Sequence, residues 1–298
     1  MTIPVWFQDW YNNGSGGIAA AAQTYIDRVE ADGGAVESIG CVPSAVWDWT
    51  APDYDAAVQT WIAKLITEGF TSPSSDNLSL LNTFVLALKS AGVWSNLDVI
   101  QVWAQDSNSV NAGRVNVVNP SDTLATLYNS VSFTNKVGIT GDGVSAYVDT
   151  GYNPSTYGGN YASGDNFNGC WVHSGATGLG AIVGNAVSQN IRIFNAGTSN
   201  HRVYSAIVGS FTDLSGSGWV AANKKTNATA SLFKDTTEST FSGMLNLAIP
   251  NENMTLLRSD AVYTDAGISI YMAGANMTSD NTAIHTAVNN YLTGVAAL

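Results

Sequence analysis

The chain is poor in charged side chains, and those it has are mostly acidic. Charged residues make up 11% of its 298 residues, and 23 acids stand against 11 bases, which gives a formal net charge of −12. Proteins that bind nucleic acid neutralise phosphates with a broad basic surface. The lone "NKK" at residues 223–225 is too small to supply one. The composition therefore argues against nucleic acid as a partner.

Cysteine and histidine are also scarce, which limits the metal sites that the chain can build. Cys41 and Cys170 stand alone and far apart, so we expect two buried thiols rather than a disulfide framework or a thiolate metal site. The histidines, His173, His201 and His285, have neither the HExxH nor the H-x-H spacing of a zinc site. We therefore predict no metal and no cofactor.

Glutamate is also rare, and this bears on hydrolysis of polysaccharides. A retaining glycosidase needs two carboxyl groups about 5 Å apart, which alternate residues of one strand can supply. None of the five glutamates forms such an acid-x-acid strand pair. We therefore predict no catalytic residues, and an enzyme that trims surface polysaccharide is the least favoured interpretation.

Long hydrophobic runs are missing, although 45% of the residues are hydrophobic. No window reaches the roughly 18 to 20 apolar residues of a membrane span. The opening "MTIPVWFQDWYNN" lacks the basic start and apolar core of a signal peptide. We therefore expect no membrane span and synthesis in a cytoplasm, with enough apolar surface for a sizeable core.

Helical periodicity dominates the first third of the chain. Apolar residues recur on one face over residues 17–30, 55–67 and 76–90, and Gly69 and Gly92 follow the last two segments. Asp76 can cap the third helix. A further helix closes the chain, with Thr278 or Ser279 as its cap and a stripe of apolar residues at helical spacing. These patterns predict a small α-region at the start and one helix at the end.

After Trp94 the hydrophobic period changes from 3.6 to 2. Turn residues separate the apolar stretches at intervals of roughly 8 to 15 residues, the spacing of an antiparallel sandwich. The predicted strands are VIQVWA (99–104), RVNVV (114–118), AYVDT (146–150), CWVHS (170–174), NIRIF (190–194), RVYSAIV (202–208), WVAAN (219–223), ASLFK (230–234), LNLAI (245–249) and GISIYMA (267–273). The chain is therefore predicted to be mainly β.

Several of these stretches resemble bacteriophage structural proteins that carry a concanavalin A-like (LamG-like) jelly-roll domain. The resemblance is carried by "LLNTFVLALKSAGVWSNLDVI" (80–100), "FTNKVGITGDGVSAYVDTGYNP" (133–154), "SLFKDTTES" (231–239) and "MTSDNTAIHTAVNNYLTGV" (277–295), with "AQTYIDRVEADGGAVES" (22–38) upstream. One departure is "DTTES" where the family usually has an "NG" turn, which leaves the turn type of that hairpin open.

The resemblance implies a division into two parts and a place in a virus particle. Residues 1–94 are expected to form an α-helical anchoring region, and residues 95–298 the β-sandwich, a concanavalin A-like jelly roll closed by the C-terminal helix. The implied protein is a virion component of the fibre or attachment type, homo-oligomeric, with other virion proteins and host cell-surface glycans as partners. A capsid decoration or minor head or tail protein without a ligand is the alternative.

The loop "GDGVSAYVD" (141–149) could in principle hold a cation. A calcium loop of the EF-hand kind places oxygen ligands at alternate positions and ends in a bidentate Glu, whereas this stretch has no Glu. Asp142 between two glycines is better explained as a turn, with Tyr147 and Asp149 on one face of the strand that follows. A calcium site at the sandwich rim, built from Asp149 or Asp165 with backbone carbonyls, stays open.

The loop "GYNPSTYGGNYASGDNFNG" (151–169) has the composition of a saccharide site. Exposed aromatic faces stack on pyranose rings, and amides or carboxylates bind the hydroxyls. The alternative is a solvated loop or a contact between subunits, since Tyr is also enriched at protein interfaces. The candidate ligand-binding residues are Tyr152, Asn153, Tyr157, Asn160, Tyr161 and Asp165.

Four aromatic residues crowd the N-terminal segment "PVWFQDWY" (4–11): Trp6, Phe7, Trp10 and Tyr11. Such a segment either tucks under its own helices or docks on another chain. Aromatic anchors are typical of protein interfaces, so we expect these residues to attach the chain to a neighbour in the virion.

Overall fold

The computed structural model describes residues 54–157, 159–175, 179–185, 192–196, 201–205, 207–210, 217–226, 229–242, 249 and 251–298. Residues Tyr54–Leu298 form one compact unit. The predicted helix at 17–30, Cys41, the predicted anchor residues Trp6, Phe7, Trp10 and Tyr11, and almost all of the predicted strand at 245–249 lie outside the described residues.

Three α-helices have the bounds that the apolar spacing predicts to within two or three residues. They are α3 (Ala56–Thr67), α4 (Ser75–Ser90) and α5 (Asn281–Ala297). Gly69 and Gly92 follow α3 and α4 with φ of 68° and 74°, the left-handed conformation that glycine adopts at no steric cost. None of the described helices is long and apolar enough to cross a membrane.

Two predicted helix caps are wrong by a few residues. The side chain of Ser74, not that of Asp76, accepts a hydrogen bond from the backbone N–H of Asn77 and caps α4. Residues Thr278–Asp280 form a 3-10 turn (η4) instead of starting the last helix, and Asp280 is the N-cap residue of α5. Residues of the expected capping types are present, but which of them caps the helix depends on the loop that leads into it.

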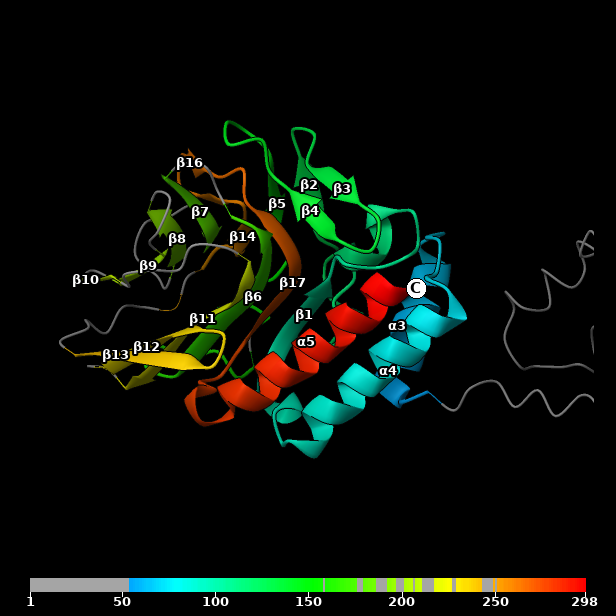
Figure 1. The fold of residues 1–298 in the computed structure, drawn as a ribbon, viewed down its shortest axis with the longest axis horizontal. Helices are drawn as coiled ribbons and strands as arrows, with labels where there is room; N and C mark the ends of the chain where they lie inside the picture. Colours follow the sequence, from blue (N-terminus) through cyan, green and yellow to red (C-terminus); the bar gives the residue numbers. More distant parts are fainter. Residues whose placement is uncertain are drawn as a thin grey trace, which may run out of the picture. The chain divides into compact units, whose positions relative to one another are not determined.

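The described strands form two antiparallel sheets and a small hairpin, which confirms the predicted β-sandwich (Figure 1). The first sheet runs β13 (Thr237–Ser242), β12 (Thr229–Lys234), β11 (Gly218–Thr226), β6 (Asn166–Ser174), β17 (Gly267–Gly274), β4 (Gly138–Thr140), β3 (Ser132–Thr134), and β1 (Leu97–Val102) also pairs with β17. The second sheet runs β10 (Ile207–Ser210), β9 (His201–Ser205), β8 (Arg192–Ala196), β7 (Leu179–Gly184), β14 (Thr255–Leu256), β5 (Tyr147–Asp149), β2 (Thr126–Tyr128). The hairpin joins β15 (Arg258–Ser259) to β16 (Val262–Tyr263).

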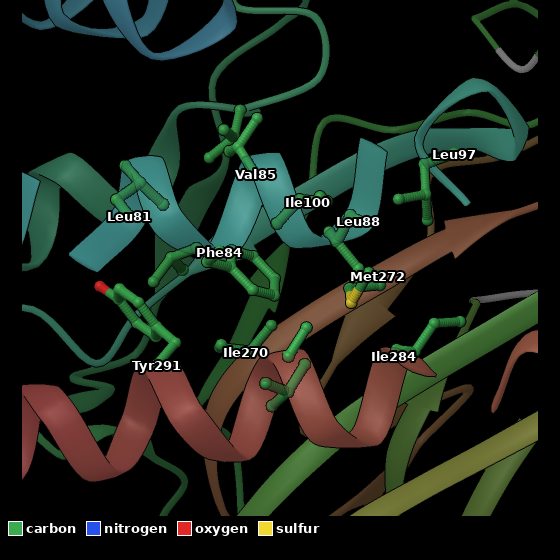
Figure 2. Packing of buried hydrophobic residues seen from close by; sticks show 14 of the residues in the cluster. Leu81, Phe84, Val85, Leu88, Leu97, Ile100, Ile270, Met272, Ile284 and Tyr291 are labelled. Atoms are coloured by element: carbon green, nitrogen blue, oxygen red, sulfur yellow. The ribbon is translucent and has the colours of Figure 1, made fainter. Parts of the chain in front are cut away.

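The first sheet is covered on its outer face by the helices. Helices α4 and α5 lie side by side along this face (Figure 1), and α4, α5, β1 and β17 contribute to one apolar cluster. Figure 2 shows Phe84 of α4 pointing toward α5, and its ring centroid lies 5.6 Å from that of Tyr291 on α5. Because helices pack on one face and the second sheet on the other, every residue of β17 is buried, which explains its nearly unbroken apolar sequence.

A second apolar cluster fills the space between the two sheets. Ile268 and Val220 of the first sheet and Val148 and Leu256 of the second belong to it. Cys170 of β6 is part of this cluster and is a free thiol, as predicted. Burial raises the pKa of this thiol to about 12, so the Cys170 side chain packs as a neutral, unreactive group.

The predicted strand at residues 114–118 is wrong. Residues Val110–Arg114 form a 3-10 turn (η3). The segment that follows joins β1 through one backbone bond, from the Val117 N–H to the Ile100 carbonyl at 2.9 Å, and through the side chain of Asn116. The amide of Asn116 accepts from the Ile100 N–H at 3.0 Å and donates to the Asp98 carbonyl at 2.9 Å. An asparagine side chain mimics the peptide group here, a substitution that hydrophobic alternation does not reveal.

The "GDG" loop is a turn, but it does not join a pair of neighbouring strands as expected. Strand β4, before the loop, lies in the first sheet, and β5, after it, lies in the second. The loop therefore crosses from one sheet to the other. The Asp142 carboxylate accepts hydrogen bonds from the backbone N–H groups of Val144, Ser145 and Ala146, and these bonds hold the pKa of Asp142 well below its ordinary value.

The hairpin that departs from the family pattern still has a two-residue turn. Lys234 pairs with Thr237 across β12 and β13, so Asp235 and Thr236 form the loop. Asp235 has φ of 53° and its carboxylate accepts from the Trp219 N–H at 2.9 Å. Aspartate tolerates the left-handed conformation at this position, so the hairpin turns without a glycine.

Candidate functional site

The predicted ligand loop is fixed to β1 by one buried carboxylate. Asp98 is 8% exposed, and its oxygens accept from the hydroxyl of Tyr152 at 3.0 Å and from the backbone N–H groups of Gly159, Asn160 and Tyr161 at 3.2, 2.9 and 2.9 Å. The side-chain amide of Asn160 adds a bond at 3.0 Å. A buried carboxylate needs such a complete set of donors, and here the donors come from the loop.

Two of the predicted ligand-binding tyrosines belong to the core. Tyr152 is 2% exposed and Tyr161 is 4% exposed, so their rings offer no face to a saccharide in solution. The hydroxyl of Tyr161 accepts from the Asn168 amide at 3.2 Å. Burial raises the pKa of Tyr161 to about 12, and burial together with the neighbouring Asp98 raises the pKa of Tyr152 far above its ordinary value. Their expected exposure is wrong because Asp98 and Asn168 provide internal partners for both hydroxyls.

The other predicted residues do not gather at one place. Tyr157 is 46% exposed at the loop tip, and its hydroxyl lies 3.4 Å from the Thr123 hydroxyl, which donates to it. Asn153 caps the same tip by accepting from the Ser155 N–H. Asp165 instead binds the backbone N–H of Asn276. The structure thus keeps one exposed aromatic side chain from the predicted loop, Tyr157.

The acidic residues considered for a rim calcium ion are bound to protein donors. Asp149 accepts from the Gly151 N–H at 2.9 Å and from the Asn253 amide at 2.8 Å, and Asp165 accepts from Asn276. Within the part of the chain that the structure describes, no three His, Cys, Asp or Glu side chains are grouped so that they could hold a metal ion.

A second group of aromatic residues lies on the outer face of the second sheet. Along β2 and β5 the inward positions are Leu127 and Val148, which contact the core between the sheets. Tyr128 and Tyr147 alternate with them and therefore point outward. Tyr263 of β16 and Arg258 of β15 adjoin Tyr147. We call Tyr128, Tyr147, Arg258 and Tyr263 the tyrosine–arginine strip.

The four side chains of the strip form a continuous series of ring contacts. The rings of Tyr128 and Tyr147 are stacked, with centroids 4.5 Å apart and planes 5° apart. The Arg258 guanidinium carbon lies 4.5 Å from the Tyr147 centroid and 5.8 Å from that of Tyr263. Tyr128 is 39% exposed and the other three are half-buried. The strip is therefore an ordered aromatic surface that reaches solvent.

The β15–β16 hairpin positions Arg258 because glycines let it lie against β7. A Cβ atom at Gly180 would meet the Thr264 side chain, and one at Gly184 would meet the Ser259 side chain. The Ser259 hydroxyl donates to the Asn185 carbonyl at 3.1 Å, and the Arg258 Nε donates to the Asp260 carbonyl at 2.7 Å. Close backbone approach at these glycines therefore fixes the hairpin and, through it, the guanidinium.

Burial raises the pKa of the Tyr147 hydroxyl above its ordinary value, although the charge of Arg258 opposes the rise. Tyr147 consequently presents a neutral ring near pH 7. The strip combines apolar ring surface, hydroxyl groups and a single positive charge, which are groups that can contact a polar ligand with an apolar face.

The sequence-based predictions missed both Asp98 and the strip. Asp98 could have been found, because an acid inside the apolar run "LDVIQV" must have buried partners. The strip draws its side chains from β2, β5 and the β15–β16 hairpin, which are distant in sequence. Only the sheet topology brings Arg258 to Tyr147.

Comparison with known proteins yields structural likeness only. No family model and no curated protein matches the chain. Among solved structures, domain 4 of AbnA, a GH43 extracellular arabinanase from Geobacillus stearothermophilus in complex with arabinotriose, is similar at 14% identity and a TM-score of 0.43, over 64% of this chain and 98% of that one.

Two larger proteins contain a similar region. The receptor binding domain of botulinum neurotoxin C/D mosaic serotype matches at 9% identity and a TM-score of 0.49, over 65% of this chain and 51% of that one. Trypanosoma rangeli sialidase matches at 8% identity and a TM-score of 0.48, over 72% and 40%. The chain thus spans about half or less of these two proteins. The assignment of a ligand rests on the residues of this chain alone.

Proposed function

We propose that this chain is a non-catalytic saccharide-binding β-sandwich module. The observation that carries the proposal is the tyrosine–arginine strip, because it is an ordered aromatic surface on the face of the second sheet. Its most exposed ring, that of Tyr128, is 39% exposed, so a ligand can reach the strip. A pyranose stacks its C–H face on a tyrosine ring, and hydroxyl and guanidinium groups at the edge bind its oxygens.

A binding role is favoured over hydrolysis on chemical grounds. Retaining hydrolysis needs a second carboxyl group about 5 Å from the first, and no glutamate forms an acid-x-acid strand pair in the sequence. Beside the strip, one oxygen of Asp149, Oδ1, accepts from the Gly151 N–H and the Asn253 amide.

We also propose that the module belongs to a bacteriophage particle, where it contacts host surface glycans and other virion proteins as a homo-oligomer. The support is the sequence resemblance of residues 80–100, 133–154, 231–239 and 277–295 to phage structural proteins. Immunogold labelling of purified particles tests this placement. Labelling on fibres agrees with an attachment role, and labelling on the capsid shell alone favours the decoration alternative.

The saccharide-binding proposal is tested by a glycan array probed with the full chain. We expect binding to a defined set of saccharides, and loss of that binding in Tyr128→Ala, which removes the most exposed ring of the strip. Leu86→Ala is the matched control, because Leu86 is an exposed apolar residue of α4, 48% exposed, on the opposite layer. A full chain that binds no saccharide, or a Tyr128→Ala variant that binds as well as the parent, contradicts the proposal.

A further inference from the structure

Among the residues that the structure describes, Arg258 has no acidic partner, although the chain as a whole is strongly acidic. The chain has 23 acids and 11 bases, and the described ion pairs join Lys64 to Glu68, Lys89 to Asp55 and Lys234 to Asp235. Arg258 forms no ion pair with any carboxylate in the described ranges. A half-buried guanidinium left unpaired among so many acids marks a place where an external anion can supply the missing partner.

The guanidinium is also held in a fixed orientation. Its carbon lies 4.5 Å from the Tyr147 centroid and 5.8 Å from the Tyr263 centroid, and its Nε donates to the Asp260 carbonyl at 2.7 Å. These contacts leave the two terminal nitrogens available to a ligand. Together they form the fork that binds a carboxylate bidentately. Because the side chain is already ordered, little rotamer entropy is lost when an anion binds.

The surroundings of Arg258 favour a ligand that is flat and apolar next to its charge. Tyr147 contacts the guanidinium, and Tyr128 stacks on Tyr147 with 4.5 Å between centroids. An inorganic anion would use the guanidinium alone and leave these rings idle. An acidic oligosaccharide uses both, because one sugar can place its carboxylate on the guanidinium fork while an adjoining ring stacks its C–H face on Tyr128, on the other side of Tyr147.

We propose that the tyrosine–arginine strip binds acidic saccharides, with the ligand carboxylate on Arg258 and an adjoining sugar ring on Tyr128. This inference rests on the proposed saccharide-binding function and adds the charge of the ligand to it. Asp149, on the same face of β5 as Tyr147, forms no ion pair with Arg258, and its Oδ1 atom accepts from the Gly151 N–H and the Asn253 amide.

Isothermal titration of the full chain with matched pairs of probes tests the inference. The pairs are sialyllactose with lactose, and trigalacturonate with its methyl ester. In at least one pair, the affinity of the acidic member is expected to exceed that of the neutral member by about tenfold or more. One charge-assisted bidentate contact gives an affinity ratio of this size. About 1 M salt, where the Debye length is about 3 Å, should reduce that preference.

The variants assign the preference to Arg258. Arg258→Gln should remove the difference between the acidic and neutral members, and Arg258→Lys, which keeps the charge but loses the fork, should retain part of it. Lys64→Gln on α3 is the control, because it changes the net charge equally at a partly buried ion pair outside the strip. Circular dichroism checks that each variant is folded. If Arg258→Gln does not fold, the Arg258→Lys variant and the salt series decide the question.

The outcomes separate the two proposals. Equal affinity for acidic and neutral members, or a preference that survives in both Arg258 variants, overturns the acidic specificity and leaves the saccharide-binding function standing. Absence of binding to every probe overturns both. If the strip instead controls self-association, so that Tyr128→Ala changes the sedimentation of the chain but no probe binds, the strip is a protein interface and both proposals are wrong.

Discussion

The ring of Tyr128 lies parallel to the ring of Tyr147 across two neighbouring strands, with 4.5 Å between centroids and 5° between planes. The two residues are directly opposite each other in the β2–β5 register. Cross-strand aromatic pairs stabilise sheets, and this pair also prepares a flat surface for a ligand.

We expect this stacking to be measurable as a coupling free energy. Single and double Tyr128→Ala and Tyr147→Ala variants, unfolded with urea, should show a coupling of about 0.5–1.5 kcal/mol. The control pair is Tyr128→Ala with Tyr157→Ala. Tyr157 lies at the loop tip and not in the strip, so the effects of these two substitutions on the free energy of unfolding should add. Strict additivity of the Tyr128 and Tyr147 substitutions would show that the two rings do not stabilise each other.

Asp98 is expected to be essential for the stability of the Tyr-rich loop. Asp98→Ala leaves the Tyr152 hydroxyl and several backbone N–H groups without their acceptor, so the free energy of unfolding should fall by about 3–5 kcal/mol. Asp260→Asn, at an exposed position that tolerates φ of 55°, should change it by less than about 0.5 kcal/mol. Equal effects of the two substitutions in chemical denaturation would contradict the role given to Asp98.

The helical layer should contribute to the stability of the sandwich as part of the same core. Phe84 of α4 is 2% exposed and contacts Tyr291 of α5, whereas Leu86, two residues on, is 48% exposed. Phe84→Ala is expected to cost about 3–5 kcal/mol, and Leu86→Ala less than about 0.5 kcal/mol. Thermal and urea unfolding should give one transition for the described unit, and separate transitions for helices and sheets would argue against a shared core.

The turn at Asp142 should make stability depend on pH in a defined direction. The folded state lowers the pKa of Asp142 through bonds from three backbone N–H groups, whereas the unfolded pKa is about 3.9. The stabilisation is therefore present above about pH 4 and is lost as the pH falls below it. The stability difference between the parent chain and Asp142→Ala, measured by urea unfolding, should shrink on acidification.

Asp142→Asn provides the control for this pH series. Its amide oxygen can accept the same hydrogen bonds, but it does not titrate, so its own contribution should stay constant with pH. A difference between the parent chain and Asp142→Ala that is unchanged from neutral to acidic pH would contradict the assignment of these bonds to the carboxylate.

The sequence predicted the fold class because hydrophobic period and turn residues are local signals. The bounds of α3 and the apolar face of α5 follow from the spacing of residues such as Trp61 and Ile284, and β17 is continuous and apolar. Alternation also placed Tyr147 and Asp149 on one face of β5 with Val148 on the other, as the structure has them.

The errors arise where the long-range contacts of a single side chain override the local sequence pattern. Asn116 stands in for a backbone ladder beside β1, so an alternating stretch is not a strand. Asp98 draws Tyr152 and Tyr161 into the core, so a Tyr-rich loop is not a row of exposed rings. Arg258 meets Tyr147 through pairings between strands far apart in the sequence, which no single stretch records. The site was therefore less predictable than the fold.

The most direct test of the account compares the two exposed aromatic positions, Tyr128 on the strip and Tyr157 on the loop tip, in one titration. A saccharide that binds the full chain is titrated into the parent, Tyr128→Ala and Tyr157→Ala. We predict that Tyr128→Ala weakens binding by about tenfold or more, the value of a stacking contact of about 1.4 kcal/mol, and that Tyr157→Ala binds like the parent. The opposite result, with affinity lost in Tyr157→Ala and kept in Tyr128→Ala, would place the ligand on the loop and contradict the account.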